Sequence, residues 1–187
     1  KKNNIYMTMK TRFTLLTFLC LFLFTHGQAQ NNPILSGSTK FGVKFIFGTC
    51  NGTFDPPSGK VQFKESDLDK AYFDLKVPVE SFNTRISRRD KDMKSADYFD
   101  VAKYPYIHFK STKVYKKGNA YETVGMMKIK DVSKEVILPF TAEKQSDGSM
   151  LLKSNFMINR LDYKVGEKSK KMKEEVQLEM TLQIGAI

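Results

Sequence analysis

The sequence predicts one domain built mainly from antiparallel β-strands, about eight in number, with one short helix. Two observations support this prediction: long stretches in which apolar and polar residues alternate, and turn residues between those stretches. The composition, 41% apolar and 27% charged in 187 residues, is that of an ordinary globular protein. Alternation of this kind occurs in both β-barrels and β-sandwiches, so the pattern alone leaves both architectures open.

The first 29 residues differ from the rest and are expected to form a cleaved signal peptide. Four basic residues and no acidic one precede an apolar stretch from Phe13 to Phe24, and small residues follow at Gly27 and Ala29. This order is typical of a secretory signal. An apolar stretch of about a dozen residues is shorter than the roughly 20 that span a bilayer. We therefore expect bacterial export, to the periplasm or outside the cell, with residues 30–187 as the mature domain.

Removal of this segment changes the charge and the cysteine count. The formal charge falls from +11 to +7, because residues 1–29 carry four basic and no acidic residues. Cys20 is lost, so Cys50 remains alone and no intramolecular disulfide is expected. Lipidation of Cys20 is not expected, since the preceding Leu19 is not small. Cys50 has no histidine near it in sequence and is expected to be a structural thiol.

The first half of the mature domain alternates in three stretches, over residues 41–47, 61–63 and 71–79. Gly48 and Gly52 follow the first stretch and predict a bend or bulge in it. The apolar side chains of these stretches are expected to face inward: Phe41, Val43, Phe45, Phe47, Val61, Phe63, Ala71, Phe73, Leu75, Val77 and Val79.

The alternation breaks over residues 81–99, where we expect the helix. Thr84 is suited to capping its N-terminus, and the apolar residues Ile86 and Met93 fall on one side of it. An aromatic loop is expected to follow the helix.

From residue 106 onward the alternation is nearly continuous and predicts the remaining strands. Turns are expected at residues 131–134 and 146–149. The cleanest alternation covers residues 176–184. The expected inward side chains of this half include Ile107, Phe109, Met127, Phe140, Phe156, Leu178 and Met180.

Several segments, in this order along the chain, resemble the YceI-like family. The most specific are SFNT at 81–84, RDKDMKS at 89–95, DYFDVAKYP at 97–105 and NRLDY at 159–163. The resemblance covers nearly all of the mature domain. It implies an elongated, eight-stranded, lipocalin-like antiparallel barrel with a helix packed against it, in exported proteins that bind a polyisoprenoid or another long amphiphile. The chain departs from the family pattern at several positions, among them Lys164, where the family usually has glycine.

The residues also make a physical case for a long apolar ligand. A barrel of about eight strands either fills its interior with side chains or holds one small ligand. Methionine and phenylalanine suit an adaptable apolar cavity, and each methylene group removed from water contributes about 0.8 kcal/mol. The expected cavity lining is Phe45, Phe73, Leu75, Val77, Phe109, Met127, Phe140, Phe156, Leu178 and Met180.

Together with the resemblance, these residues predict an exported carrier or binding protein for a polyisoprenoid, such as a quinone or polyprenol, or for a fatty amphiphile. The alternative is a non-catalytic structural or interaction barrel with a filled core. Arg85, Arg88 and Arg89 are candidates for contacts with a polar or phosphorylated head group, because arginine binds phosphate bidentately. Asp90 and Arg160 are expected to hold the fold together.

Other classes of function are not expected. The mature domain has one histidine, His108, and lacks the residue patterns of a Ser–His–Asp set, a metal cluster or a phosphate-binding loop. Asp90, Asp92, Asp97 and Asp100 are expected in surface salt bridges. The pI of about 9.5 does not indicate nucleic-acid binding in an exported protein. The lysines of residues 164–173 are expected to form a solvated loop with transient attraction to an anionic membrane surface. No cofactor is required, and the sequence does not decide between a monomer and a homodimer.

Overall fold

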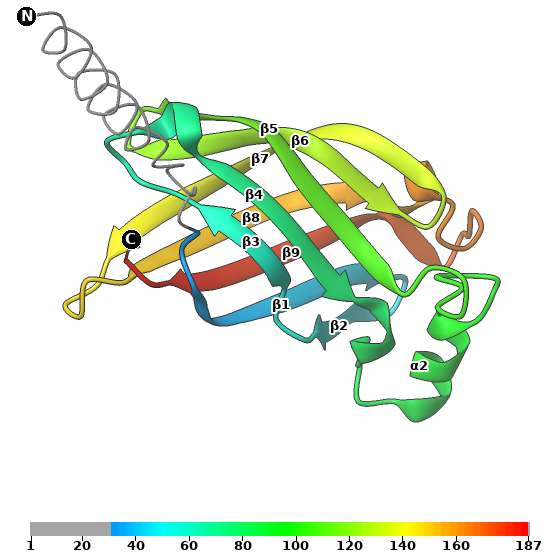
Figure 1. Ribbon diagram of the computed structural model, residues 1–187. Coiled ribbons are helices and arrows are strands. Elements are labelled where there is room, and N and C mark those ends of the chain that lie inside the picture. Colours follow the sequence, from blue (N-terminus) through cyan, green and yellow to red (C-terminus); the bar gives the residue numbers. More distant parts are fainter. Residues whose placement is uncertain (1–30, 187) are drawn as a thin grey trace, which may run out of the picture. The chain divides into compact units, whose positions relative to one another are not determined.

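The computed structural model describes residues 31–186, which form one antiparallel sheet curled into a barrel with a single α-helix beside it (Figure 1). The expected signal peptide, residues 1–29, and Cys20 lie outside the described residues. The nine strands follow the order β2-β1-β9-β8-β7-β6-β5-β4-β3 in the sheet. Their bounds are β1 (Ile34–Phe45), β2 (Gly48–Phe54), β3 (Ser58–Gln62), β4 (Tyr72–Pro78), β5 (Tyr106–Lys117), β6 (Ala120–Ile129), β7 (Val132–Lys144), β8 (Met150–Asn159) and β9 (Met172–Ile184). The helices are α2 (Ser87–Lys94) and the short 3-10 segments η2 (Leu68–Lys70), η3 (Val79–Ser81) and η4 (Arg160–Tyr163).

The predicted antiparallel β class is confirmed, with nine strands where about eight were expected. The extra strand arises because the segment after Val43 is a hairpin and not a bent strand. Phe45 pairs with Gly48 across the turn, and Gly48 has φ +132°, a conformation that favours glycine. The prediction that Phe45 and Phe47 are buried is wrong: their exposed fractions are 38% and 98%, because they lie at the tip of this hairpin.

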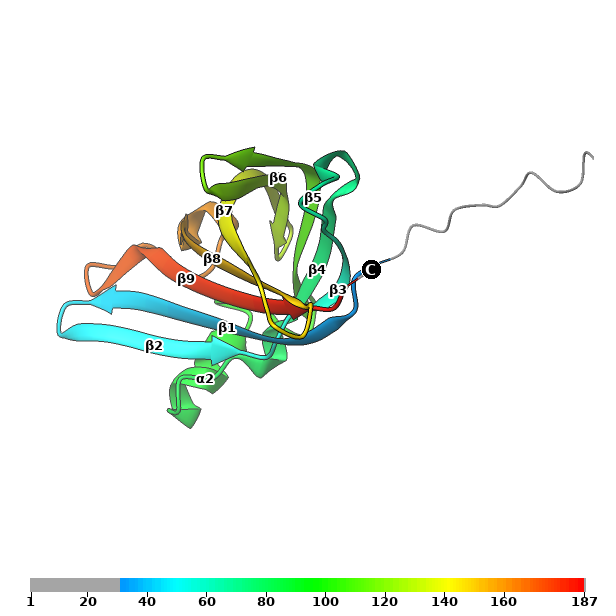
Figure 2. The ribbon, with the colours of Figure 1, turned by 90° about the vertical axis from the view of Figure 1, so that its left-hand side faces the viewer.

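The two ends of the barrel differ, and the buried side chain of Asn32 closes one of them. The Asn32 backbone N–H donates to the Val61 carbonyl at 2.7 Å. Its side-chain oxygen accepts from the Phe63 N–H, and its amide donates to the Gly185 carbonyl, both at 2.7 Å. These bonds join the start of β1, the end of β9 and the segment that includes β3. We call this the Asn32 end and the opposite one, next to the β1–β2 turn, the α2 end; Figure 2 shows this turn beside the start of β9.

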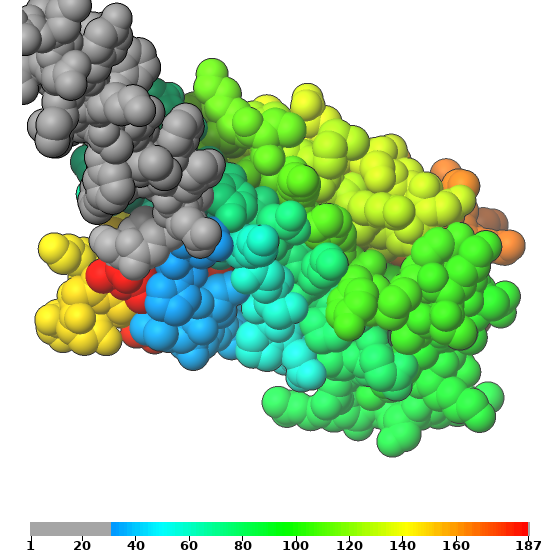
Figure 3. Space-filling view, viewed as in Figure 1, coloured from blue at the N-terminus to red at the C-terminus, as the bar shows by residue number. Residues whose placement is uncertain are grey.

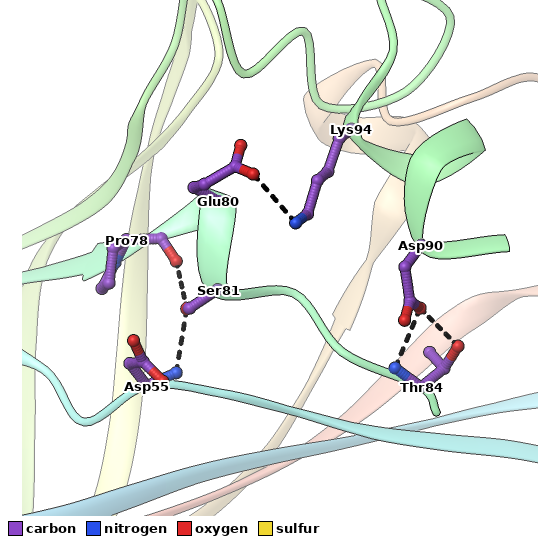
Figure 4. A network of polar contacts seen from close by, with 7 residues as sticks. All are labelled: Asp55, Pro78, Glu80, Ser81, Thr84, Asp90 and Lys94. Carbon is purple, nitrogen blue, oxygen red and sulfur yellow. Dashed lines mark hydrogen bonds and ion pairs between the residues drawn. The ribbon is translucent and has the colours of Figure 1, made fainter. Parts of the chain in front are cut away.

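The α-helix begins at Ser87, and the prediction that Thr84 caps it is wrong. Arg85 has φ +63°, so the chain turns between Thr84 and the helix. The Thr84 side chain instead donates to the Asp90 carboxylate, as Figure 4 shows. The same view shows Lys94 of α2 paired with Glu80 at 3.0 Å. In the space-filling view the segment with α2 projects beside the strands (Figure 3).

Two aromatic clusters mark the two ends of the core. Phe63, Phe73, Tyr121 and Phe140 lie toward the Asn32 end, with ring centroids 5.2–6.4 Å apart. The second cluster lies toward the α2 end and contains Phe41, Phe54, Phe82 and Phe99. Among residues 31–186 no helix is long and apolar enough to cross a bilayer.

Candidate functional site

The interior of the barrel contains a cavity of about 110 Å³, which we call the inner chamber. Its walls come from the inward faces of β4 to β9, together with Thr39 of β1 and Phe54 of β2. A cavity of roughly 10–15 Å³ by this measure holds one water molecule, so the chamber is far larger than a packing defect. Its lining is almost entirely apolar, and cavities with such a lining stay dry and accept apolar ligands.

A second apolar cavity of about 80 Å³, the outer chamber, lies toward the α2 end. It is lined by β1, β2, β8 and β9 and also by residues from α2 and the loops around it. Five residues, which we call the waist, line both chambers: Phe54, Ile107, Ile129, Ile158 and Leu178. The two chambers therefore lie next to each other along the barrel interior, with the waist residues between them.

The burial pattern agrees with a hollow interior. Along β9 the inward side chains of Val176, Leu178 and Met180 are only half-buried, and each lines a chamber. Further along the same strand, at the Asn32 end, Leu182 and Ile184 are buried. The side chains near the middle of the barrel thus face space, whereas those at the Asn32 end pack against one another.

Nine of the ten residues predicted to line a cavity surround the inner chamber: Phe73, Leu75, Val77, Phe109, Met127, Phe140, Phe156, Leu178 and Met180. Phe45 lines the outer chamber instead. Alternation in the sequence predicted these positions because a strand places every second side chain on one face. It did not predict Phe82 and Phe99, which reach the outer chamber from outside the strands.

Thr39 is a polar residue of the inner chamber whose hydroxyl has no hydrogen-bond partner among the described residues. Its exposed fraction is 2%. By contrast, the hydroxyl of Thr123, which also lines this chamber, donates to the Lys113 carbonyl at 3.2 Å. Thr39 therefore presents an unused donor and acceptor at a largely apolar wall. Sequence reasoning missed it because a threonine on a strand carries no special pattern.

The candidate head-group arginines are separated by the fold. Arg89 lines the outer chamber and also an open recess of about 970 Å³ on the outer face of β1, β2 and β9, which we call the surface groove. Arg85 lines the surface groove as well, whereas Arg88 lines neither of them. The Arg89 Nε donates to the Thr84 hydroxyl at 2.8 Å. Arg89 thus stands at the border between the apolar interior and the charged outer surface.

Asp90 and Arg160 hold neighbouring loops in place through hydrogen bonds, in agreement with their expected structural role. Asp90 Oδ1 accepts from the Thr84 N–H at 2.9 Å and from its hydroxyl at 2.5 Å. The buried Arg160 guanidinium donates to the carbonyls of Val165, Glu167 and Lys173 at 2.8–3.2 Å. Burial lowers the pKa of Arg160, but arginine stays charged in proteins.

The expected surface salt bridges of the acidic residues near the helix are absent. In the described part of the chain, none of Asp90, Asp92, Asp97 and Asp100 forms an ion pair. Burial raises the pKa of the Cys50 thiol, and the positive charge of Arg89 acts in the opposite direction. A buried thiol with a raised pKa is a poor nucleophile, as expected for a structural cysteine.

The chain is similar to several known proteins. A family model described as the YceI-like domain matches residues 33–184. A UPF0312 protein of Photorhabdus laumondii is 35% identical over 97 residues, which are 52% of this chain and 50% of that protein. The chain spans about half the length of the curated relatives it matches.

Two solved structures have a similar fold. BcnA of Burkholderia cenocepacia has a TM-score of 0.74 at 22% identity, and the match covers 79% of this chain and 95% of BcnA. A polyisoprenoid binding domain from Saccharophagus degradans, implicated in plant cell wall breakdown, has a TM-score of 0.65 at 12% identity. That match covers 84% of this chain and 98% of the domain.

Proposed function

This chain belongs to the YceI-like domain family, and from that premise we propose that it binds and carries a long apolar lipid inside its barrel. The observation that carries the proposal is the pair of neighbouring apolar chambers, which share the five waist residues. The polyisoprenoid binding domain from Saccharophagus degradans has the same fold, which favours a polyisoprenoid such as a quinone or polyprenol; a fatty amphiphile has the same apolar chemistry.

The dimensions of the chambers suit a chain-like ligand. On β9 the chambers extend from Met172 to Leu182, and ten residue steps along a strand cover roughly 33 Å. An extended hydrocarbon chain fits a run of that length. Each methylene group contributes about 0.8 kcal/mol, so a chain of tens of carbons binds tightly without hydrogen bonds.

A polar head group fits best at the α2 end. Arg89 borders both the outer chamber and the surface groove, so a chain lying in the chambers brings its head group next to this guanidinium. Arg85 and Lys44 also line the surface groove and add positive charge. Arginine forms bidentate bonds with phosphate, so an anionic head group is the preferred chemistry. Arg88 lies outside these cavities, and its proposed head-group contact has the least support.

We further propose that the mature domain is exported and non-catalytic. The signal-like order of the first 29 residues supports export to the periplasm or the medium. Within residues 31–186 no group of three or more His, Cys, Asp or Glu side chains is placed to hold a metal ion. The walls of both chambers offer binding chemistry and few groups that titrate.

The test is to identify what the protein carries. Residues 31–186 contain the complete sheet, so residues 30–187 are exported to a bacterial periplasm, purified and extracted with organic solvent for mass spectrometry. We expect an isoprenoid or fatty lipid in a fixed ratio to protein.

A charge in the inner chamber provides the matched comparison. Met180→Arg places a cation against an apolar wall and is expected to abolish retention of the lipid. Ile137→Arg adds the same charge to the outer face of β7, away from both chambers and the surface groove, and is expected to retain it. An empty extract from the unmodified protein would favour the structural or interaction barrel, and equal retention by a folded Met180→Arg variant would show that the ligand lies elsewhere.

A further inference from the structure

The turn between β1 and β2 exposes two large apolar side chains. Ile46 is 58% exposed and Phe47 is 98% exposed, so neither contributes much to the core. We call these two residues the apolar tip. Neighbouring exposed apolar side chains with a polar rim are typical of sites that contact a protein or a membrane.

Lysines surround the apolar tip. The Ile46 N–H donates to the Lys171 carbonyl at 3.1 Å, which places the tip beside the segment before β9, as Figure 2 also shows. Residues 167–175, which run from that segment into the start of β9, and Lys44 of β1 carry exposed positive charge at Lys44, Lys168, Lys170, Lys171 and Lys173. The acidic residues there are Glu167, Glu174 and Glu175, and Glu174 is paired with Lys168 at 3.6 Å. The surface around the tip is therefore net positive.

The apolar tip is continuous with the outer chamber. Phe45, next to the tip, and Met172, next to Lys171, pair across β1 and β9 and both line that chamber. The same two residues line a recess of about 530 Å³ between the tip and the lysines. A membrane or partner that covers the apolar tip thus lies at the α2 end of the barrel, next to the outer chamber.

From these observations we propose that the apolar tip and its lysines dock the protein on an anionic lipid bilayer. The two apolar side chains enter the interface between head groups and acyl chains, and the lysines contact the phosphates. This deepens the proposed function and rests on it, because docking by this end places the chambers where a lipid enters or leaves the membrane.

The experiment measures binding of residues 30–187 to vesicles by co-sedimentation. Phosphatidylcholine vesicles with and without phosphatidylglycerol are the probes. We expect binding only with phosphatidylglycerol and weaker binding at high salt. Phe47→Ser should weaken binding by at least about tenfold, and Lys170→Gln with Lys171→Gln by about tenfold or more at low salt. Since Phe47 is almost fully exposed, its replacement leaves the fold intact.

Ile137→Ser is the matched control, because Ile137 is 57% exposed on β7, away from the tip; it should bind like the unmodified protein. Equal binding by all variants, or no dependence on phosphatidylglycerol, overturns the proposal. A second overturning result is that Phe47→Ser splits a dimer in analytical ultracentrifugation and leaves vesicle binding unchanged, because the tip is then an interface between two copies.

Lipid extraction of the same samples separates docking from the proposed function. If the protein carries a lipid but does not bind the vesicles, only the docking proposal is refuted. If the protein binds the vesicles through the apolar tip but its extract contains no lipid, only the carrier function is refuted.

Discussion

Narrowing the waist should exclude a long ligand from the inner chamber. Ile158 of β8 and Leu178 of β9 line both chambers and lie on the inward faces of adjacent strands. In the double variant Ile158→Phe/Leu178→Phe, two phenyl rings enter the waist from neighbouring strands. Because they add bulk beside the buried Phe54 and Ile129, the ligand-free protein should lose about 1–3 kcal/mol of stability.

The loss of affinity follows from the length of the inner chamber. On β9 this chamber extends from Leu178 to Leu182, four residue steps that cover about 13 Å and accommodate roughly ten methylene groups. At about 0.8 kcal/mol each, these groups contribute about 8 kcal/mol. If about half of this is offset by the lost freedom of the lipid chain, the double variant binds the lipid about a thousandfold more weakly.

The assay compares the lipid extracted from purified protein with that from a matched control. Met126 and Glu135 pair directly across β6 and β7, face outward and line neither the chambers nor the surface groove. The control Met126→Phe/Glu135→Phe therefore adds two rings to a pair of adjacent strands, outside the barrel, and should retain the lipid. If the waist variant retains the same lipid in the same amount as this control, the ligand does not pass the waist and the two chambers are not one binding path.

Three further predictions concern stability, measured by denaturant or thermal unfolding. Thr39→Val removes the unpartnered hydroxyl and should stabilise the ligand-free protein by about 1 kcal/mol; a loss of stability would mean that the hydroxyl is hydrogen-bonded. Burial and the hydrogen bond to Glu65 raise the pKa of Tyr121 to about 12. The free energy of unfolding should therefore fall as pH rises from about 10 to 12, by up to about 1.4 kcal/mol per pH unit. An equally steep fall in the Tyr121→Phe variant would assign this pH dependence to other groups. Lys164 has φ +55°, a left-handed conformation that favours glycine. Lys164→Gly and Lys164→Ala both lose the ion pair with Asp131, so their comparison isolates the backbone, and the glycine variant should be about 1 kcal/mol more stable. Equal stability of the two variants would show that the left-handed backbone carries no strain.

The helix region shows where pattern reasoning is weakest. Thr84 is a good capping residue by type, yet the left-handed backbone at Arg85 separates it from the helix. Its hydroxyl bonds to Asp90 and Arg89 instead. A capping preference predicts the helix start only if the capping residue lies directly before the helix. The positive φ at Arg85 cannot be predicted from the sequence, and it moves the helix start by several residues.

The β1–β2 hairpin shows how one turn changes which side chains are buried. Period-two alternation continues through Phe45 and Phe47, so the pattern predicts that both are buried. The chain reverses after Phe45, and the same alternation then leads out of the barrel. The two side chains that alternation predicts as core are thereby available for the surface on which the proposed membrane docking depends.

The sequence by itself determined the β class, the inward face of most strands and nine of the residues around the inner chamber, because alternation is local and each strand repeats it many times. Only the tertiary structure decided that the interior is hollow. Whether facing side chains meet or leave a gap depends on the curvature of the sheet and on the distance between opposite walls, which no local pattern encodes. For the same reason only the structure placed Arg89 at the border of the outer chamber, left Thr39 without a partner and set the lysines of residues 168–173 beside Ile46.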